Sequence, residues 1–391
     1  METKPQTNVS GVKDIIQPTI GIYPVTSLGV SFYYHCTVDL LICRKDGVTA
    51  GIFSKNPTLN IKIDGNTKEI GIADCFVNGI LDAAHKKILP SAILCTPPYC
   101  FINDMVNELT NLVSYLNSKK LLIGYTNLSR FYFPAIILAS NGIIYDEIIY
   151  NLNKNLVELD LSEQIINNIC SKVVRASIMQ GAYRENNLYY PHKKGLIKLA
   201  LPKFSLFGQA VELLTSKNYV FSIHTNPHRV EFEKAMVNIA TNSIAMIFAL
   251  DRQNALLKAM TIKEALDPSD VIQAAFVKDI QKAIFKIGQK AGGFTESDTF
   301  EKVWYPRKEQ ILKHDSEHIS SSLQCFKNMI KAKSIPEGIP DAENALIYPL
   351  KCFAKHYQLF DEVILFEELE KMLLNNLQFA RKNSDKITLT F

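Results

Sequence analysis

Three polar side chains recur at intervals of four along an otherwise apolar stretch of the sequence. Between Phe232 and Leu250 these are Lys234, Asn238 and Asn242. Four residues overshoot one turn of an α-helix by only about 40°, so we expect the three side chains to share one face of a buried helix. A buried ammonium and two buried amides need polar partners, and a cleft that holds a polar ligand would supply them. An exposed lysine at a helix start, with two asparagines bonded to backbone, is the alternative.

A second candidate site is the turn after the first expected strand. A dinucleotide-binding turn carries glycines at three positions, which allow the bend, the approach of pyrophosphate and the packing of helix on strand. When the three glycine positions of that motif are aligned with this sequence, they hold Pro24, Thr26 and Gly29. Pro24 has no N–H to offer, although the hydroxyls of Thr26 and Ser27 can donate to a phosphate. We therefore assign cofactor binding to Thr26, Ser27, Leu28 and Gly29, with an ordinary strand-to-helix turn as the alternative.

The end of the second expected strand carries a basic pair, Arg44 and Lys45. An acidic residue at this place binds an unphosphorylated ribose, whereas a basic residue suits a 2′-phosphate. If a dinucleotide binds, the pair indicates NADP(H) rather than NAD. A solvated basic pair in a turn is the alternative explanation.

The elements that position these residues divide the chain into two parts. Short apolar strands alternate with helical stretches as far as about residue 203, which predicts a mostly parallel sheet with helices on both faces. From residue 204 onward the pattern is helical apart from one strand, so we expect domains at 1–203 and 204–391. The expected strands after the first two are Glu69–Phe76, Ala92–Cys95, Leu121–Tyr125, Pro134–Ser140, Lys172–Tyr183, Gly195–Leu201 and Tyr219–His224. The expected later helices are Ser205–Thr215, a helix that starts at Asp267–Asp270 and ends near Gly292, Glu317–Lys333, Asp341–His356 and Asp361–Phe379.

Composition limits the class of protein. The chain has 391 residues, of which 47% are apolar, enough for two packed cores. The net charge of +4 and the lack of a basic run mixed with aromatics argue against a nucleic-acid partner. The first residues lack the apolar core of a secretory signal, and the segment Ala235–Leu250 is shorter than the roughly 20 residues that span a bilayer. We expect a cytoplasmic protein without a membrane span, with its eight cysteines as buried free thiols and no metal site.

Four motifs, in chain order, resemble those of the ketopantoate reductases (2-dehydropantoate 2-reductases). The stretch from Glu233 to Asn242 resembles that family's helix with a lysine and paired asparagines. The likeness covers nearly the whole chain. The other motifs are Leu138-Ala-Ser-Asn141-Gly142-Ile, similar to the asparagine-glycine turn beside the nicotinamide; Val173-Val-Arg-Ala with Gly181-Ala-Tyr-Arg184, similar to the segment that leaves the cofactor domain; and Glu317-His-Ile-Ser-Ser-Ser-Leu-Gln324, similar to a serine-bearing helix start.

The resemblance implies a Rossmann-type domain joined to a helical domain of the 6-phosphogluconate dehydrogenase C-terminal type. It implies reduction of a 2-keto acid by NADPH, with 2-dehydropantoate in pantothenate biosynthesis as the first candidate and a homodimer as a possible assembly. Lys234 would be the general acid, Asn238 and Asn242 would orient the substrate, Asn141 would hold the nicotinamide side, and Ser321 would bind the substrate.

The sequence also departs from the family's pattern. The family's acidic residue aligns best with Asp341, a shorter acid, and Glu337 or Glu343 could replace it. A lysine that the family carries after its fourth strand falls near Pro98, and His318 stands where asparagine is usual. Two other functions stay open: another reductase that joins a Rossmann domain to a helical domain, such as an opine-forming or hydroxyacid dehydrogenase, and a non-catalytic relative that binds a ligand or partner.

Overall fold

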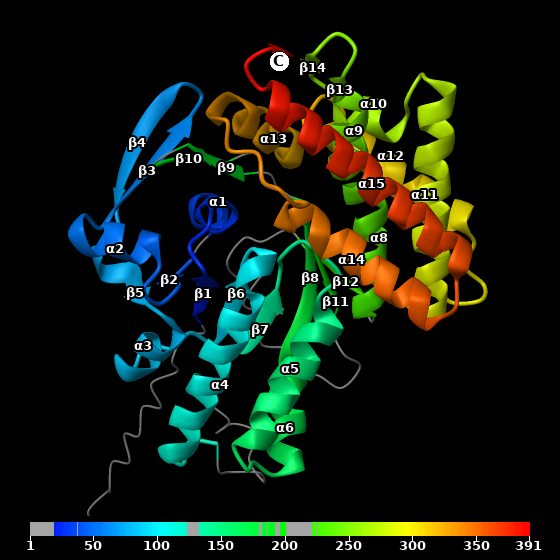
Figure 1. Ribbon diagram of the computed structural model, residues 1–391. Coiled ribbons are helices and arrows are strands. Elements are labelled where there is room, and N and C mark those ends of the chain that lie inside the picture. Colours follow the sequence, from blue (N-terminus) through cyan, green and yellow to red (C-terminus); the bar gives the residue numbers. More distant parts are fainter. Residues whose placement is uncertain are drawn as a thin grey trace, which may run out of the picture.

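The computed structural model describes residues 19–36, 38–122, 133–179, 182–185, 187–191, 196–200, 221–224 and 226–391. A sheet with flanking helices forms the N-terminal part, and a mainly helical part follows (Figure 1). The expected domain boundary at 203/204 and the expected helix Ser205–Thr215 lie outside the described residues, as does most of the expected strand Leu121–Tyr125.

The central sheet has eight strands in the order β12-β11-β8-β7-β6-β1-β2-β5. Six of them are parallel, whereas β11 runs antiparallel to β8 and β12 runs parallel to β11. In chain order the six parallel strands are arranged 3-2-1-4-5-6, which is the Rossmann arrangement. The fold prediction is confirmed. The strands are β1 Ile20–Tyr23, β2 Leu40–Cys43, β5 Phe76–Asn78, β6 Ala92–Cys95, β7 Ala135–Leu138, β8 Val173–Met179, β11 Leu196–Ala200 and β12 Phe221–His224.

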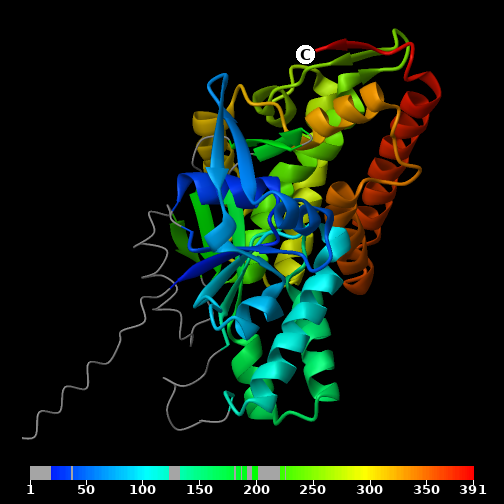
Figure 2. The same ribbon diagram turned by 90° about the vertical axis from the view of Figure 1, so that its left-hand side faces the viewer.

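Both faces of this sheet are covered, which explains why its central strands are continuous apolar runs rather than alternating ones. On one face Ile22 packs in a core with Val30 of α1 and Phe53 of α2. On the other face Tyr23 and Ile42 pack against helices α3 to α6 (Figure 2). The helices are α1 Ser27–His35, α2 Val48–Lys55, α3 Ile80–His85, α4 Ile102–Ser118, α5 Tyr145–Glu158 and α6 Glu163–Cys170, with short 3-10 turns η1 Ala73–Cys75 and η2 Tyr99–Phe101.

A second, four-stranded sheet covers α1, and the sequence analysis did not predict it. Its order is β4-β3-β10-β9, with strands β3 Thr58–Ile63, β4 Asn66–Gly71, β9 Ala182–Glu185 and β10 Leu188–Pro191. The turn at Asp64 and Gly65, both with positive φ, joins β3 to β4 and is a favoured hairpin signal. The single expected strand Glu69–Phe76 was therefore wrong, because its first half belongs to this hairpin. The expected strand Lys172–Tyr183 is also split, since β8 and β9 lie in different sheets.

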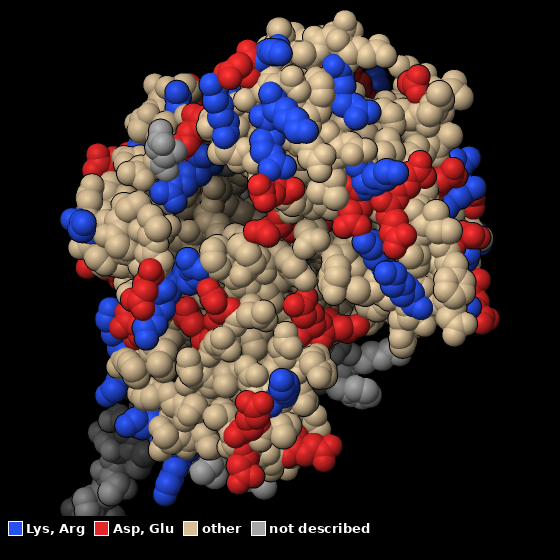
Figure 3. Space-filling model, viewed as in Figure 1, with Lys and Arg blue, Asp and Glu red and all other residues tan. Residues whose placement is uncertain are grey.

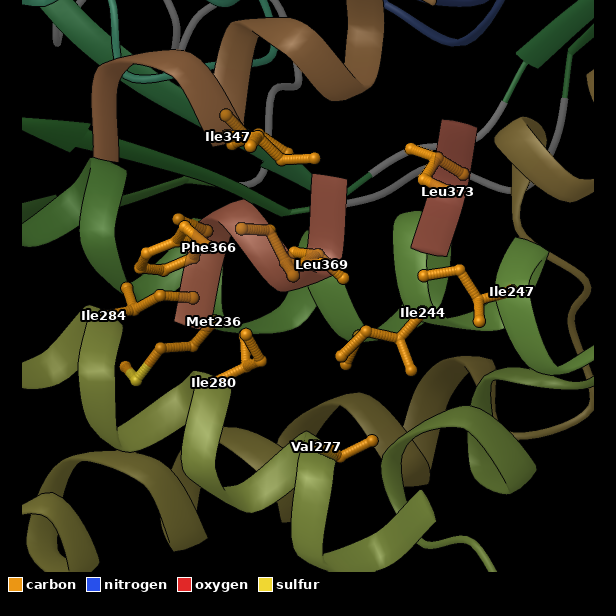
Figure 4. Close-up of a cluster of buried hydrophobic side chains, with 14 of the residues drawn as sticks. Met236, Ile244, Ile247, Val277, Ile280, Ile284, Ile347, Phe366, Leu369 and Leu373 are labelled. Carbon is orange, nitrogen blue, oxygen red and sulfur yellow. The ribbon is translucent and has the colours of Figure 1, made fainter. Parts of the chain in front are cut away.

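The helical part is built around the long apolar stretch identified in the sequence. It forms α8, a π-helical turn η4 and α9, a continuous helical segment that we call the rod. The side chains of the rod lie at the centre of one core (Figure 4). Met236 and Ile244 from this rod pack with Ile280 of α11 and with Phe366 and Leu369 of α15. The elements are α8 Pro227–Asn238, η4 Ile239–Ile244, α9 Ala245–Ala249, α10 Ile262–Leu266, α11 Val271–Lys290, α12 Phe300–Asp315, α13 Ser321–Ala332, α14 Asp341–His356 and α15 Phe360–Asn383.

The expected bounds of α14 are confirmed, but the expectation that every later segment is helical was wrong. A small sheet of β13 Leu250–Asp251, β14 Leu256–Lys258 and β15 Thr388–Thr390 closes this part, with β15 parallel to β14. All eight cysteines are free, but the expectation that they are buried holds for three of them only. Cys36, Cys43 and Cys95 are buried, Cys75 and Cys170 are half-buried, and Cys100, Cys325 and Cys352 are exposed. No helix within the described ranges combines the length and the apolar character that crossing a bilayer requires.

Candidate active site

The turn between β1 and α1 keeps one of the three glycines of a phosphate-binding turn, and the structure shows why. A Cβ added at Gly29 would lie 2.7 Å from Cγ2 of Ile22, so only glycine lets α1 pack this closely on β1. Thr26 caps α1: its hydroxyl accepts a hydrogen bond of 3.1 Å from the N–H of Gly29 and lies 2.9 Å from the hydroxyl of Thr96. The helix N-terminus thus leaves the backbone N–H groups of Ser27 and Leu28 as donors for an anion.

Arg44 follows β2 and is held beside the loop after β6. Its guanidinium lies 3.6 Å from the ring centroid of Phe101 and 3.1 Å from a carboxylate oxygen of Asp104. Lys45 contributes its backbone N–H, which donates to Glu108 at 3.3 Å, while its side chain is exposed. Of the basic pair, Arg44 is therefore the residue with a defined position at the edge of the sheet.

Lys234 lies at the carboxyl edge of the parallel strands. Its ammonium donates a hydrogen bond of 2.8 Å to the carbonyl of Ile178 in β8. Carbonyls two residues apart on a strand face the same side, and the carbonyl of Lys172 is bonded to Ile136 of β7. The carbonyl of Ile178 therefore points to the side of β8 on which β7 lies. Since β7 ends at Leu138, which pairs with Arg175, no residue of β7 lies opposite Ile178. Lys234 occupies the space beyond the end of that strand.

The surroundings of Lys234 favour its neutral form. Burial, and then the positive charges of Arg175 and Arg307, lower the pKa of Lys234 to about 7. An amine with a pKa near neutrality can both donate and accept a proton at physiological pH.

The two asparagines follow Lys234 along the same helical segment. Asn238 is the last residue of α8 and is half-buried, and Asn242 is buried within the π-helical turn η4. The amide oxygen of Asn242 lies 3.5 Å from the hydroxyl of Thr241. π-Helical turns inside helices occur often at functional sites.

A buried ion pair that the sequence analysis missed connects this rod to the sheet. Arg175 of β8 and Glu231 of α8 are both about 1% exposed and lie 2.6 Å apart. The other donors of Arg175 bond to four carbonyls, including those of Ser140 and Gly142 in the loop after β7. The same oxygen of Glu231 accepts the N–H groups of Ile144 and Tyr145. The pair therefore fixes the loop that carries Asn141 relative to the helix that carries Lys234.

Asn141 itself is exposed at the carboxyl end of β7. The next residue, Gly142, has a φ of 116°, and a Cβ there would lie 2.9 Å from the carbonyl oxygen of Ala345. The N–H of Ile143 donates to that same carbonyl at 3.1 Å. The turn thus packs directly on α14, and only glycine fits beside Asn141.

The expected serine and acids begin helices α13 and α14. Ser321 and Asp341 are the exposed first residues of these helices. Burial and a hydrogen bond to Asp341 raise the pKa of Cys100, in the loop after β6, to about 11. Asp341 therefore lies beside the cofactor-binding part.

The two alternative acids have different surroundings. Glu343 is 2% exposed, and burial raises its pKa although a hydrogen bond to Ser322 acts in the opposite direction. Glu337 is exposed and pairs with Arg381 at 3.1 Å. Glu343 is thus the buried acid of the three, and Glu337 faces solvent.

These residues converge on the edge where ligands bind in open α/β sheets, outside the carboxyl ends of the strands. Thr26, Arg44 and Asn141 follow the carboxyl ends of β1, β2 and β7, and Lys234 lies beyond the end of β7. The surface is hollowed between the region of α1 and the regions of α13 and α14, and both basic and acidic side chains lie around the hollow (Figure 3). Within the ranges that the structure describes, no three histidine, cysteine, aspartate or glutamate residues are placed to hold a metal ion.

Solved structures share this fold over nearly the whole chain. A dimeric ketopantoate reductase from Staphylococcus aureus matches with a TM-score of 0.56 and 13% identity, over 93% of this chain and 99% of its own. A ketopantoate reductase from Ralstonia eutropha matches with a TM-score of 0.57 and 10% identity, over 92% of this chain and 99% of its own. A D-mandelate dehydrogenase solved with NADH and anilino(oxo)acetate matches with a TM-score of 0.60 and 13% identity, over 93% of this chain and 99% of its own. No family model and no curated protein sequence matches the chain. The chain therefore has the two-part fold of ketopantoate reductases.

Proposed function

We propose that the protein is an NADPH-dependent reductase of a 2-keto acid, with 2-dehydropantoate as the first substrate to test. The observation that carries the proposal is the position of Lys234, an ammonium with a pKa of about 7 beyond the end of β7. Solved structures of the same fold are described as ketopantoate reductases and as a D-mandelate dehydrogenase with NADH.

The residues present fit a dinucleotide. Gly29 gives α1 its close approach to β1, and the backbone N–H groups of the first turn of α1, at Ser27 and Leu28, suit a pyrophosphate. When bound, the dinucleotide supplies the hydride for reduction of the ketone. Pro24 and the side chain of Thr26 reduce the number of backbone donors, which favours weaker binding than an intact glycine turn gives.

The chain's own residues provide the proton and the orientation. The ammonium of Lys234 donates a hydrogen bond to the ketone oxygen and then its proton as the alkoxide develops. Asn238 and Asn242 orient the substrate along the same edge, and Asn141 supports the nicotinamide side. Ser321 and one of the acids, Asp341 or the buried Glu343, complete the substrate side from α13 and α14.

Mixing the protein, NADPH and 2-dehydropantoate tests the proposal by loss of absorbance in the reduced-nicotinamide band. We expect turnover that depends on all three components. A panel of other 2-keto acids, aromatic ones included, separates ketopantoate reduction from the second candidate, a mandelate-type hydroxyacid dehydrogenase of the same fold. If a folded preparation neither binds NADPH in a titration nor turns over any of these acids, the protein is a non-catalytic relative. Light scattering tests the proposed homodimer.

Cofactor choice is expected to depend on Arg44. We expect Arg44→Ser to raise the KM for NADPH by about 10- to 100-fold, because it removes a charge-assisted contact with the 2′-phosphate. The KM for NADH should change less than about threefold. Lys119→Ser removes an exposed positive charge at the opposite end of α4 from Arg44, so it is the matched control and should leave both values near those of the unsubstituted protein. An equal loss with both cofactors would contradict a 2′-phosphate contact.

The pH dependence should follow Lys234. Its protonated form is the proton donor and its pKa is about 7, so kcat/KM for ketone reduction should be constant below that pH and fall about tenfold per unit above it. Initial rates between pH 5.5 and 9 measure this limb. A profile that stays flat to pH 9 would exclude an amine of lowered pKa as the donor.

A further inference from the structure

The ion pair between Arg44 and Asp104 connects two elements at the cofactor-binding edge of the sheet. Arg44 follows β2, whereas Asp104 belongs to the first turn of α4, the helix after β6. In the sheet, β1 lies between β2 and β6. Since Nη1 of Arg44 lies 3.1 Å from a carboxylate oxygen of Asp104, the arginine side chain reaches from the end of β2 past the end of β1 to the start of α4.

Two further contacts fix the position of the Arg44 guanidinium. Its carbon lies 3.6 Å from the ring centroid of Phe101, one helical turn before Asp104, and an aromatic ring at this distance attracts a cation. The turn after β2 closes with a hydrogen bond of 3.0 Å from the N–H of Gly47 to the carbonyl of Arg44. A Cβ added at Gly47 would lie 3.5 Å from Nε of Arg44, so this turn borders the guanidinium as well.

The ion pair is accessible to a ligand. The side chain of Arg44 is 29% exposed and that of Asp104 is 53% exposed. The bond to Asp104 uses Nη1 alone, whereas a phosphate can engage two nitrogens of a guanidinium at once. An exposed ion pair contributes little free energy, so an anion of higher charge can replace Asp104 as the partner of Arg44.

The two charges have opposite effects on the choice of cofactor. In dinucleotide-binding sheets, an acidic residue near the end of the second strand binds the ribose hydroxyl of NAD, and an arginine there accommodates the 2′-phosphate of NADP. A phosphate monoester carries a charge of about −1.5 to −2 at pH 7, so a carboxylate beside it is repulsive. In this chain the arginine follows β2, and a carboxylate reaches the same place from α4.

Glu108, one turn further along α4, does not share this property. Its carboxylate accepts the N–H groups of Lys45 at 3.3 Å and Ile80 at 2.8 Å, and the hydroxyl of Tyr23 at 3.0 Å. These bonds fix the turn after β2 to α4 and occupy both oxygens of Glu108. Asp104 is therefore the acid of this pair that can exchange its partner for a ligand.

We propose that Asp104 is a counter-ion of Arg44 that the 2′-phosphate of NADPH must displace, and that it thereby reduces the preference for NADPH over NADH. The inference rests on the proposed function and adds a residue that determines cofactor specificity. The carboxylate of Asp104 lowers the net charge that Arg44 presents to the phosphate, but it leaves the contacts of an unphosphorylated ribose with the turn after β2 unchanged.

Titration with two nucleotides that differ only in the 2′-phosphate tests the proposal. In Asp104→Asn we expect 2′,5′-ADP to bind about three- to tenfold more tightly, because no ion pair has to break and no like charge faces the phosphate. The affinity for 5′-AMP should change less than about twofold. Glu158→Gln removes an exposed carboxylate at the far end of α5 and is the matched control. Unchanged or weaker binding of 2′,5′-ADP by Asp104→Asn would overturn the proposal, whereas damage to the fold would weaken both nucleotides.

A double substitution tests whether Asp104 acts through Arg44. In a protein that carries Arg44→Ser, adding Asp104→Asn should change the affinity for 2′,5′-ADP less than about twofold, because the ion pair is already absent. If the full increase persists in this background, Asp104 acts by repulsion alone and is not a counter-ion of Arg44.

Steady-state kinetics separate this proposal from the proposed function. With a 2-keto acid that is reduced, Asp104→Asn should lower the KM for NADPH about three- to tenfold and change the KM for NADH less than about twofold. If the nucleotides bind as expected but no 2-keto acid is reduced, the counter-ion assignment stands and the reductase assignment fails. If reduction occurs but the ratio of the two KM values is unchanged, the counter-ion assignment is wrong. If the folded protein binds neither nucleotide, both assignments fail.

Discussion

Lys234→Met is expected to lower kcat/KM for ketone reduction by about a hundredfold to ten-thousandfold, the usual range for loss of a positioned general acid. Methionine has a similar length and no proton to donate, and the carbonyl of Ile178 loses its partner. Steady-state rates with NADPH at pH 6.5 measure the effect, because the lysine is then largely protonated. Retention of more than about a tenth of the activity would remove Lys234 from the mechanism.

A measurement of stability against pH distinguishes a loss of the proton donor in Lys234→Met from a failure of that variant to fold. The folded pKa of Lys234 is about 7 and its ordinary value is 10.5, so the unfolded chain binds more protons between these pH values. The free energy of unfolding should therefore increase with pH through that interval, and Lys234→Met should lack this increase. At pH 7 the variant should be at least as stable as the unsubstituted protein, since a buried charge has been removed.

The second large effect concerns stability. Arg175→Met is expected to lower the free energy of unfolding by about 3 to 5 kcal/mol, because Glu231 then stays buried without its partner. Four carbonyls also lose a donor. Denaturant unfolding measures the change. The matched control is Arg381→Met, which breaks an exposed pair with Glu337 and should cost less than about 1 kcal/mol.

A double substitution tests whether the pair itself is responsible. Arg175→Met combined with Glu231→Gln removes the unpaired charge, so it should be more stable than Arg175→Met alone. If the two substitutions simply add, the two residues act independently and the loop after β7 is positioned by other contacts.

The elements that local patterns specify could be predicted from the sequence. The unit β1-α1-β2 follows from two short apolar strands around a helix, and α14 begins at Asp341 as expected. The bounds of α12 were not predicted, because Pro306 and many charged residues interrupt its apolar pattern, although contacts with α8 and α10 stabilise the helix. The hairpin at Asp64 and Gly65 carried a recognisable turn signal that was overlooked.

The residues of the candidate site also fall into those that a local sequence pattern predicts and those that it does not. The spacing of Lys234, Asn238 and Asn242 predicted residues on one rod, and the structure puts all three on it. Arg175 and Glu231 are 56 residues apart, and no local pattern relates them.

The pairing of β15 with β14 has a consequence for synthesis on the ribosome. Residues 388–390 complete a sheet whose other two strands lie within residues 250–258, and α15 supplies several side chains to the core around α8. Domains generally fold as units, the earlier one first during translation. The sheet-containing part has all its described strands once residue 224 has emerged, but the helical part must wait for more than 160 further residues. Until then the apolar side of α8 has no α15 to cover it. We therefore expect the nascent protein to expose apolar surface of the kind that chaperones bind.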